Sequence, residues 1–371
     1  MSGDDNAVNT IVSTIEPCRL YPAAMQKKKP TTRAVTIDEV ASHAGVSIKT
    51  VSRVMNRESA VRDSTRQRVL AAAKELNYKP NPAARSLASN RSYFVAMVYD
   101  NPSASYLLDF QTGALEACRE RGYSLLLQPC DYQSPQLVEE LVTLVTERGN
   151  PGLVLTPPLS DLSDVVGQLD KLGVKFVRVA PVDPEHPSPY VAVDDRAAAY
   201  DLTRYLIDMG HKRIGFIKGH PDHGASQARF EGYRGALRDR GLAPDKTLIV
   251  QGFFSFDSGE QCGRTLLARK DRPTAIFASN DEMAAGVLHI AHEMGIDVPS
   301  TLSVAGFDDT PVSRYTWPSL TTIRQPVEAM AKSVVGTLIA VMRDERKKDQ
   351  SKGTLFPYEL VIRGSTGPVG R

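Results

Sequence analysis

Hydrophobic residues near the amino terminus follow two short helical stripes with a corner between them. The stripes are formed by Ile37, Val40 and Ala41 and by Val51, Val54 and Met55. Apolar residues at this spacing share one face of a helix. Gly45 lies between the stripes, where glycine adopts the positive φ of a tight turn without a Cβ clash. The pattern predicts a helix-turn-helix, a motif whose second helix can enter a DNA major groove.

Polar residues at the ends of these stripes predict where the helices begin. Thr36 is expected to be the N-cap of the first helix, with Glu39 at position N3 completing a capping box. Ser47 is expected to cap the second helix, which should run to about residue 56. A third helix is expected over residues 64–76, with Ser64 as its N-cap and Leu70 among its inward residues.

The polar edge of the second helix carries side chains suited to reading base pairs. Ser47, Ile48, Lys49 and Arg53 lie at its start and one turn later. Lys49 and Arg53 can donate hydrogen bonds to guanine O6 and N7, and Ile48 can pack against a thymine methyl. The valines on the opposite side of this helix are expected to face the core of the three helices.

A further short helix is encoded at residues 81–89. Asn81 is a suitable N-cap, and Pro82 suits the first helical position. A helix of about eight residues is marginal by itself in water because nucleation is costly. We therefore expect this helix to form only when another surface packs against it. An ordinary linker is the alternative.

From residue 91 onwards, short apolar runs alternate with longer helical patterns in two series. The strands expected in the first series are 94–98, 125–127, 153–155 and 176–179, with helices at 107–121, 135–147 and 162–172. The second series has strands at 214–217, 248–250, 275–277 and 303–305 and helices at 196–209, 229–240, 258–267 and 282–294. Such alternation predicts parallel sheets with helices on both faces, here as two Rossmann-like lobes. A helix at 327–343 and strands at 321–323 and 359–362 indicate that the chain returns between the lobes.

Charge is unevenly distributed along a chain of otherwise ordinary globular composition. The 371 residues carry a net charge of +2 and are enough for two or three domains. Between residues 31 and 90, ten Lys and Arg residues stand against five Asp and Glu residues. A basic head suits a polyanion such as DNA, although a solvated charged face explains the charge alone equally well.

Motifs that would indicate other classes of protein are missing from the sequence. The four cysteines form no CxxC pair or Cys/His cluster, and nucleotide-binding, hydrolase and metalloprotease signatures are also missing. We therefore expect no enzymatic activity, no cofactor and no metal. The amino terminus lacks the apolar segment of a secretory signal, and no apolar run reaches about 18 residues. A cytoplasmic, nucleoid-associated protein is expected.

The chain resembles the LacI/GalR family of bacterial transcriptional regulators. The resemblance is carried by VSIKTVSRVMN and ELNYKPNPAARSL in the head and by MGHKRIGFI, NDEMAAGVLHIAHEMGIDVP, VAGFDD and PSLTTIRQP further on. It implies an all-α helix-turn-helix head and an α/β regulatory domain of the periplasmic-binding-protein type I fold. The expected domains are a disordered arm (1–32), the head (33–80), a hinge helix and linker (81–91), and an effector-binding and dimerisation domain (92–371).

The resemblance also assigns DNA contacts to individual residues of the head and hinge. Leu87 is implied to be an apolar wedge that enters the minor groove and kinks the duplex. Phosphate contacts are implied for the hydroxyl and amide side chains of the first two helices. The complete expected set is Thr36, Ser47, Ile48, Lys49, Thr50, Ser52, Arg53, Asn56, Tyr78, Asn81, Ala84 and Leu87.

An effector is expected between the lobes, because ligands of open α/β sheets bind beyond the carboxyl ends of the strands. This rule nominates 99–106, 156–158, 180–183, 194–195, 218–223, 253–254, 279–281 and 307–309. The resemblance implies effector contacts at Asn101, Tyr106, Asp194, Arg229, Phe254, Asn280 and Asp308. Asp281 is expected to be a helix N-cap instead, and core packing is the alternative for Phe254. Carboxylates, arginine and aromatic rings suit the hydroxyls and apolar faces of a sugar.

The leading hypothesis is a repressor of carbohydrate-utilisation genes that binds a palindromic operator as a homodimer and is released by a sugar or glycoside. A corepressor-dependent regulator that binds a nucleobase or another small metabolite is the alternative. A sugar-binding protein without DNA function and an enzyme on an α/β scaffold are less consistent with the head and the missing motifs. The carboxyl terminus has no leucine heptads, so we expect no tetramerising coiled coil.

Overall fold

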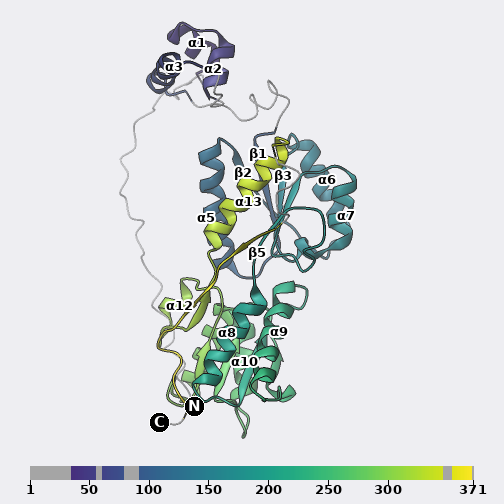
Figure 1. Cartoon of the computed structure of the whole chain (residues 1–371), viewed down its shortest axis with the longest axis vertical. Helices are drawn as coiled ribbons and strands as arrows, with labels where there is room; N and C mark the ends of the chain where they lie inside the picture. The colour runs from purple at the N-terminus through teal and green to yellow at the C-terminus, as the bar shows by residue number, and fades with distance from the viewer. Residues whose placement is uncertain (1–34, 56–60, 79–91, 346–352, 370–371) are drawn as a thin grey trace, which may run out of the picture. The chain divides into compact units, whose positions relative to one another are not determined.

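The computed structural model describes residues 35–55, 61–78, 92–345 and 353–369. The chain divides into two compact units, Met1–Pro80 and Asn81–Arg371. The described part of the first unit is a head of short helices, and that of the second unit consists of two α/β lobes (Figure 1). No helix among the described residues is both long enough and apolar enough to span a membrane.

The head packs α1 (Ile37–Ala44), α2 (Ile48–Met55) and α3 (Asp63–Glu75) around a small apolar core. The expected caps of α1 and α2 are confirmed. The Thr36 backbone N–H donates to Glu39 Oε2 at 2.7 Å, the Glu39 N–H donates to Thr36 Oγ1 at 3.4 Å, and the Thr50 N–H donates to Ser47 Oγ at 3.2 Å. Gly45 ends α1 at φ 61°, as the tight turn requires.

Two expectations for α3 are wrong. The helix begins at Asp63, one residue before the expected Ser64 cap, and its N-cap residue Arg62 makes no side-chain capping hydrogen bond. Leu70 is 43% exposed rather than buried. The buried stripe of α3 runs through Val69, Ala72 and Ala73. Leu70 follows Val69, and because each step along a helix turns by about 100°, its side chain lies off this stripe.

The first lobe is built on a six-stranded parallel sheet in the order β11-β5-β4-β3-β1-β2. Its strands are β1 (Phe94–Tyr99), β2 (Ser124–Pro129), β3 (Gly152–Leu155), β4 (Phe176–Val179), β5 (Tyr190–Val193) and β11 (Gly353–Phe356). Helices α5 (Ala104–Arg121) and α13 (Val327–Met342) cover one face. Helices α6 (Leu137–Glu147) and α7 (Ser163–Lys171) cover the other.

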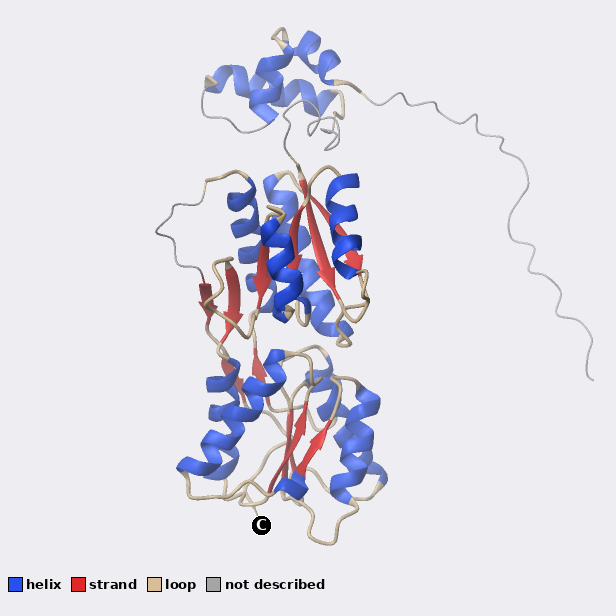
Figure 2. Cartoon of the chain, turned by 90° about the vertical axis from the view of Figure 1, so that its right-hand side faces the viewer, coloured by secondary structure: helices blue, strands red, loops and turns tan. Residues whose placement is uncertain are grey.

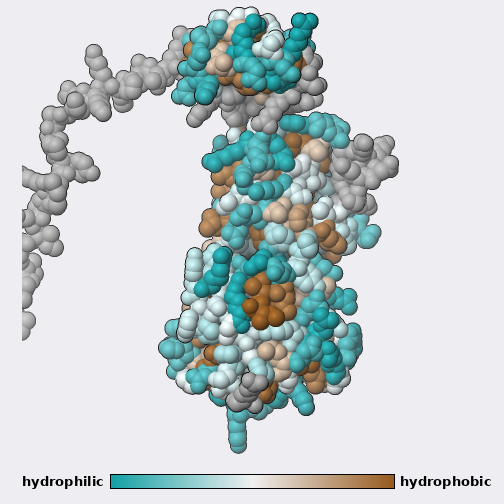
Figure 3. Space-filling view, turned by 60° about the vertical axis from the view of Figure 1, so that its left-hand side comes forward, coloured by the Kyte–Doolittle hydropathy of each residue, from teal (hydrophilic) through white to brown (hydrophobic). Residues whose placement is uncertain are grey.

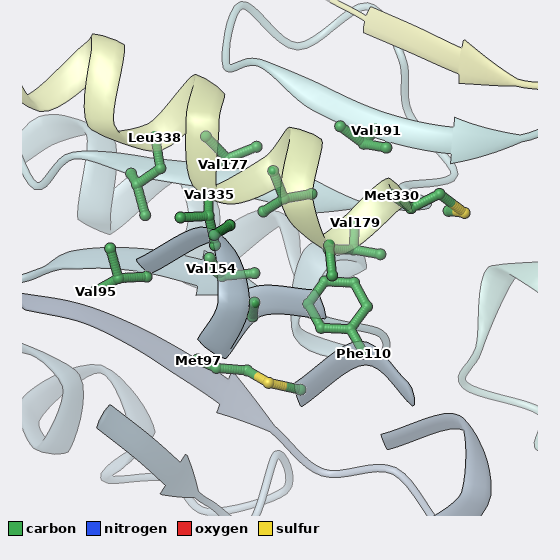
Figure 4. Packing of buried hydrophobic residues seen from close by; sticks show 14 of the residues in the cluster. Val95, Met97, Phe110, Val154, Val177, Val179, Val191, Met330, Val335 and Leu338 are labelled. Atoms are coloured by element: carbon green, nitrogen blue, oxygen red, sulfur yellow. The ribbon is translucent and has the colours of Figure 1, made fainter. Parts of the chain in front are cut away.

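Beta-branched and long apolar side chains fill the first face of this sheet. In Figure 4, Phe110 of α5 and residues of α13 such as Met330 and Leu338 lie over strand residues such as Val95 and Val154. All five side chains are at most 1% exposed. Burial of this size is the main favourable contribution to the stability of a lobe.

The second lobe is built on a four-stranded parallel sheet in the order β7-β6-β8-β9. Its strands are β6 (Ile214–Lys218), β7 (Ile249–Gln251), β8 (Ala275–Ala278) and β9 (Ser303–Ala305). Helices α8 (Asp195–Asp208) and α9 (Gly224–Asp239) cover one face, and α10 (Phe256–Leu267) and α11 (Asp281–Glu293) cover the other. Both sheets lie between layers of helices in Figure 2.

The chain passes between the lobes at residues 193–195, 324–327 and 356–359. The short helix α12 (Val312–Tyr315) and strand β10 (Thr322–Arg324) precede the second passage. Strand β10 pairs antiparallel with β12 (Glu359–Val361), which follows the third passage. The two series of strands and helices expected from the sequence are confirmed, and so is the return between lobes. Strands β5 and β11 were not predicted from the sequence, although they are as long as the predicted strands β3, β4 and β8.

Candidate functional site

The second helix of the head presents a polar edge to solvent. Ser47, Ile48 and Lys49 are exposed, with Ile48 at 48% of its residue surface, whereas Val51 and Val54 are buried in the head core. A half-exposed isoleucine buries little apolar surface in the head, so packing of the head core does not explain an isoleucine at this position. Such an edge is suited to base contacts in a major groove.

The remaining residues of the expected DNA-binding set differ in their surroundings. Thr50, Ser52 and Arg53 are partly exposed on α2. Thr36 belongs to the α1 capping box, and Tyr78 packs against the head core. Four further expected contacts, Asn56, Asn81, Ala84 and Leu87, lie outside the described residues.

A small cavity of about 50 Å³ lies between the two lobes at the carboxyl ends of their strands. Six of the seven expected effector contacts line it: Asn101, Tyr106, Arg229, Phe254, Asn280 and Asp308. Asp195 and His223 also line it, and both belong to segments nominated by the strand-end rule. Gln325 and Ala225 line it as well, and neither was predicted from the sequence.

Arg229 is the centre of a buried charged network in this cavity. Its Nε donates to Asp195 Oδ1 at 2.7 Å and its Nη1 donates to the Ser279 carbonyl at 2.5 Å. Its Nη2 lies 3.5 Å from Asp308 Oδ1, and its guanidinium lies 3.7 Å from the centre of the Phe307 ring. Burial acts to lower the pKa of Arg229, but the two carboxylates outweigh it and raise that pKa. The guanidinium is therefore held charged and oriented by the protein itself.

Asp308 is the carboxylate of this network with the most unusual environment. It follows β9 at φ 110°, is 7% exposed, and accepts a hydrogen bond from Gln325 Nε2 at 2.7 Å. Burial raises the pKa of Asp308 to about 7, against the opposing effect of Arg229. Near neutral pH this side chain can accept a hydrogen bond from a ligand hydroxyl or donate one to it.

Asp194, which was expected to contact the effector, has a different role in the structure. Asp194 does not line the cavity: it is the exposed N-cap of α8, and its Oδ1 accepts from the Ala197 N–H at 2.9 Å. Of these two neighbours it is Asp195, the first residue inside the helix, that lines the cavity and binds Arg229.

The expected cap of α11 is also displaced by one residue. Asn280 caps this helix by accepting from the Met283 N–H at 3.0 Å, and it lines the cavity as well. Asp281 is buried instead, where its carboxylate accepts from the Thr310 N–H and the Thr322 hydroxyl. The prediction that Asp281 is the N-cap is therefore wrong.

Aromatic side chains complete the wall of the cavity. Phe254 is 6% exposed at φ 62°, and its ring centre lies 5.5 Å from that of His223. Phe254 both lines the cavity and packs in the core of the second lobe, so the two alternatives for it are both met. Burial lowers the pKa of His223 to about 4, so that its ring is neutral at pH 7.

Among the described residues, no group of His, Cys, Asp and Glu side chains could hold a metal ion. Cys118, Cys130 and Cys262 are free thiols. The cavity instead combines hydrogen-bond acceptors, one fixed cation and aromatic walls, which is the composition of a site that binds a small polar molecule.

Comparisons with known proteins agree with this arrangement of a head and two lobes. Residues 36–81 match the model for bacterial regulatory proteins of the lacI family, and residues 203–366 match that for a periplasmic binding protein-like domain. The HTH-type transcriptional regulator DegA of Bacillus subtilis (strain 168) is 32% identical over 337 residues, which cover 90% of this chain and 98% of DegA.

Solved structures extend the similarity to bound states. A complex of the transcriptional regulator CelR with cellobiose is 31% identical with a TM-score of 0.68, over 89% of this chain and 99% of that one. The Lac repressor dimer bound to operator and the anti-inducer ONPF is 27% identical with a TM-score of 0.73, over 90% of this chain and 100% of that one. The similarity thus covers both the head and the two lobes.

Proposed function

The chain belongs to the LacI family of bacterial regulatory proteins, and from this premise we propose that it is a repressor of carbohydrate-utilisation genes, released from its operator by a sugar or glycoside. The family makes it a DNA-binding transcriptional regulator and not an enzyme. The observation that carries the proposal is a buried network of carboxylates and arginine in a cavity between two lobes. The same chain presents the exposed polar edge of α2.

The charge of the cavity supports a neutral ligand rich in hydroxyl groups. Arg229 is occupied by Asp195, Asp308 and a carbonyl, so it offers little free charge to an anion. The carboxylates and Gln325 present acceptors to hydroxyl donors, and Phe254 can pack against the apolar face of a sugar ring. The CelR relative was solved with cellobiose, which is a ligand of this kind.

The expected homodimer is supported by apolar side chains that the described chain leaves uncovered. Tyr315 and Trp317 of the second lobe are 82% and 96% exposed, and Leu108 on α5 of the first lobe is 61% exposed. Figure 3 shows hydrophobic side chains reaching the surface of both lobes. Two heads held by a two-fold axis match a palindromic operator with two half-sites.

The hinge proposal rests on the sequence and the resemblance alone. Residues 81–89 lie outside the described residues, so Leu87 remains a proposed minor-groove wedge. A Leu87→Ala variant with an intact head is expected to lose operator affinity in a gel-shift titration. Unchanged affinity would remove the hinge assignment without affecting the cleft.

Ligand screening by thermal shift tests the effector. A library of neutral sugars and glycosides is expected to contain a compound that raises the melting temperature, and the shift should vanish in Asp308→Ala. Asp194→Ala is the matched control, because this exposed cap does not line the cavity and the shift should persist. Fluorescence anisotropy with an operator selected from random duplexes then shows whether the sugar weakens binding.

Two outcomes favour the corepressor alternative. A nucleobase that stabilises the protein when no sugar does would replace the sugar assignment. A ligand that tightens operator binding would reverse the polarity of the switch, because linkage requires the DNA-bound state then to bind that ligand more strongly.

A further inference from the structure

The helix that carries Arg229 begins without a cap from its own lobe. The N-cap residue of α9, His223, makes no side-chain capping hydrogen bond. Gly224 is the first residue of the helix, and a backbone N–H at this position has no partner within the helix. The start of α9 also forms part of the cavity wall, because Ala225 and Arg229 lie one turn apart and both line it.

The missing cap comes from the first lobe. Asp161 lies at the end of a short 3₁₀ turn, Leu159–Asp161, that follows β3. Its Oδ2 accepts from the Gly224 N–H at 3.2 Å, and its Oδ1 accepts from the Val182 N–H at 2.7 Å. One carboxylate thus joins two loops of the first lobe to the amino end of a helix in the second, where the helix dipole favours negative charge.

Close approach of the lobes at this point depends on glycine. A Cβ on Gly224 would lie 1.9 Å from Val182 Cγ2 and 3.1 Å from Asp161 Oδ2. A second contact between the lobes lies nearby, where the Tyr132 hydroxyl of the first lobe donates to Asp222 Oδ2 of the second. Asp161 and α9 thus meet across the boundary between the lobes, so their contact requires the lobes to approach closely here.

We infer that Asp161 is a positioning residue that couples closure of the two lobes to the effector-binding helix α9. Closure supplies the helix with its cap and fixes the position of Arg229 in the cavity wall. Opening removes the cap and no longer fixes Arg229. The inference rests on the proposed effector cleft, since it concerns how that same cavity is closed. Nothing in the ligand chemistry of the cavity requires Asp161, which does not line it.

Hydrogen exchange followed by mass spectrometry tests this coupling in the full-length, ligand-free protein. In Asp161→Ala, amide exchange in a peptide that covers residues 224–226 is expected to be about fivefold faster than in the wild type, the effect of losing a typical helix cap. Asp161→Asn keeps an acceptor oxygen and should restore part of the protection. Asp164→Ala removes a carboxylate from the first turn of α7 and should leave the peptide unchanged.

A purely local role for Asp161 gives a different result. If it only orders the loop of the first lobe, exchange should quicken around Val182 and not at residues 224–226, and the inference would be overturned. A second readout is the affinity for glucose, galactose, cellobiose and lactose, measured by thermal shift. A sugar that binds the wild type should bind Asp161→Ala about fivefold more weakly, following the same cap energy; an unchanged affinity also counts against the coupling.

The two proposals fail separately. If no sugar of this panel, nor any in a wider library, stabilises the wild type, the sugar assignment falls. The exchange at residues 224–226 is measured without ligand, so it decides the role of Asp161 in either case.

Discussion

At the scale of single residues, the cavity is governed by which partners surround each charge. Arg229 is held by Asp195, Asp308 and the Ser279 carbonyl, so it orders the carboxylates rather than offering itself to an anion. Asp308 has less compensation, and burial leaves its pKa near 7. The same residue is therefore a proposed ligand contact and an expected source of pH dependence.

Replacing Asp308 by Asn is expected to change how stability depends on pH. Because the folded-state pKa of about 7 is above the ordinary 3.8, the folded protein binds the proton more tightly. Asp308 therefore adds to the free energy of unfolding at pH values below its ordinary pKa, and this contribution is lost as pH rises through its folded-state pKa. The contribution is at most roughly 1.4 kcal/mol for each unit by which the two pKa values differ. Denaturant unfolding at pH 5 and pH 8 should show the wild type losing free energy of unfolding relative to Asp308→Asn. An equal difference at both pH values would contradict the raised pKa.

Lys49 is expected to discriminate between operator sequences. It is exposed on α2 beside Ile48, and loss of a specific base contact typically costs about 1–3 kcal/mol. Lys49→Ala should weaken binding to a selected operator by that amount and relax its preference at one position. Lys74→Ala, an exposed lysine of α3, is the matched control for charge alone. Equal losses in the two variants, measured by anisotropy against random competitor DNA, would mean that Lys49 does not read a base.

At the scale of elements, caps connect the local sequence to the position of a functional face. The capping box of α1 satisfies donors at the start of a helix only eight residues long, and α1 forms part of the core behind α2. In α9 a donor of the first turn, the Gly224 N–H, is satisfied from the other lobe. The local caps of α1 and α2 were predicted from sequence, those of α3 and α11 were each misplaced, and a cap from another lobe requires the fold.

Removal of the α1 cap is expected to loosen the head. Thr36→Ala should cost about 1 kcal/mol of local stability, and amide exchange within α1 should become about fivefold faster. Glu39→Ala leaves the Thr36 hydroxyl as the acceptor for the residue 39 N–H and should have a smaller effect. Protection of α1 that is the same in both variants and the wild type would show that packing alone holds this helix.

At the scale of the whole molecule, three passages of the chain join the two lobes. A closing motion about these passages would change the contacts around the cavity, which lies between the lobes. The exposed aromatic residues of the second lobe are expected to connect this motion to a second subunit. A change in lobe closure would then change the separation of two heads and hence operator affinity.

Disruption of the exposed aromatic surface is expected to produce monomers. Trp317 is 96% exposed, and Trp317→Glu would place a charge in an apolar interface, where it costs several kcal/mol without a partner. Leu172→Glu, at a 60% exposed leucine of the first lobe, is the matched control and should leave the dimer intact. Sedimentation equilibrium measures both. A Trp317→Glu protein that stays dimeric would locate the interface elsewhere.

The sequence by itself determined features whose causes are local. The stripes of the first two helices, the Thr36 and Ser47 caps, and most strands and helices of the lobes follow from the spacing of apolar residues and from capping chemistry. The strand-end rule also found most of the cavity, including Asp195 and His223, because the carboxyl ends of parallel strands meet at one edge.

Only the tertiary structure decided which neighbour of a pair faces the cavity and what lies opposite it. Asp194 and Asp195 differ by about 100° around a helix, so one caps and the other binds Arg229. Gln325 reaches Asp308 because a bridge between residues 308 and 324 brings distant segments together. Asp161 caps α9 from 63 residues away. Such contacts depend on how two lobes close, and no local pattern of residues encodes that distance.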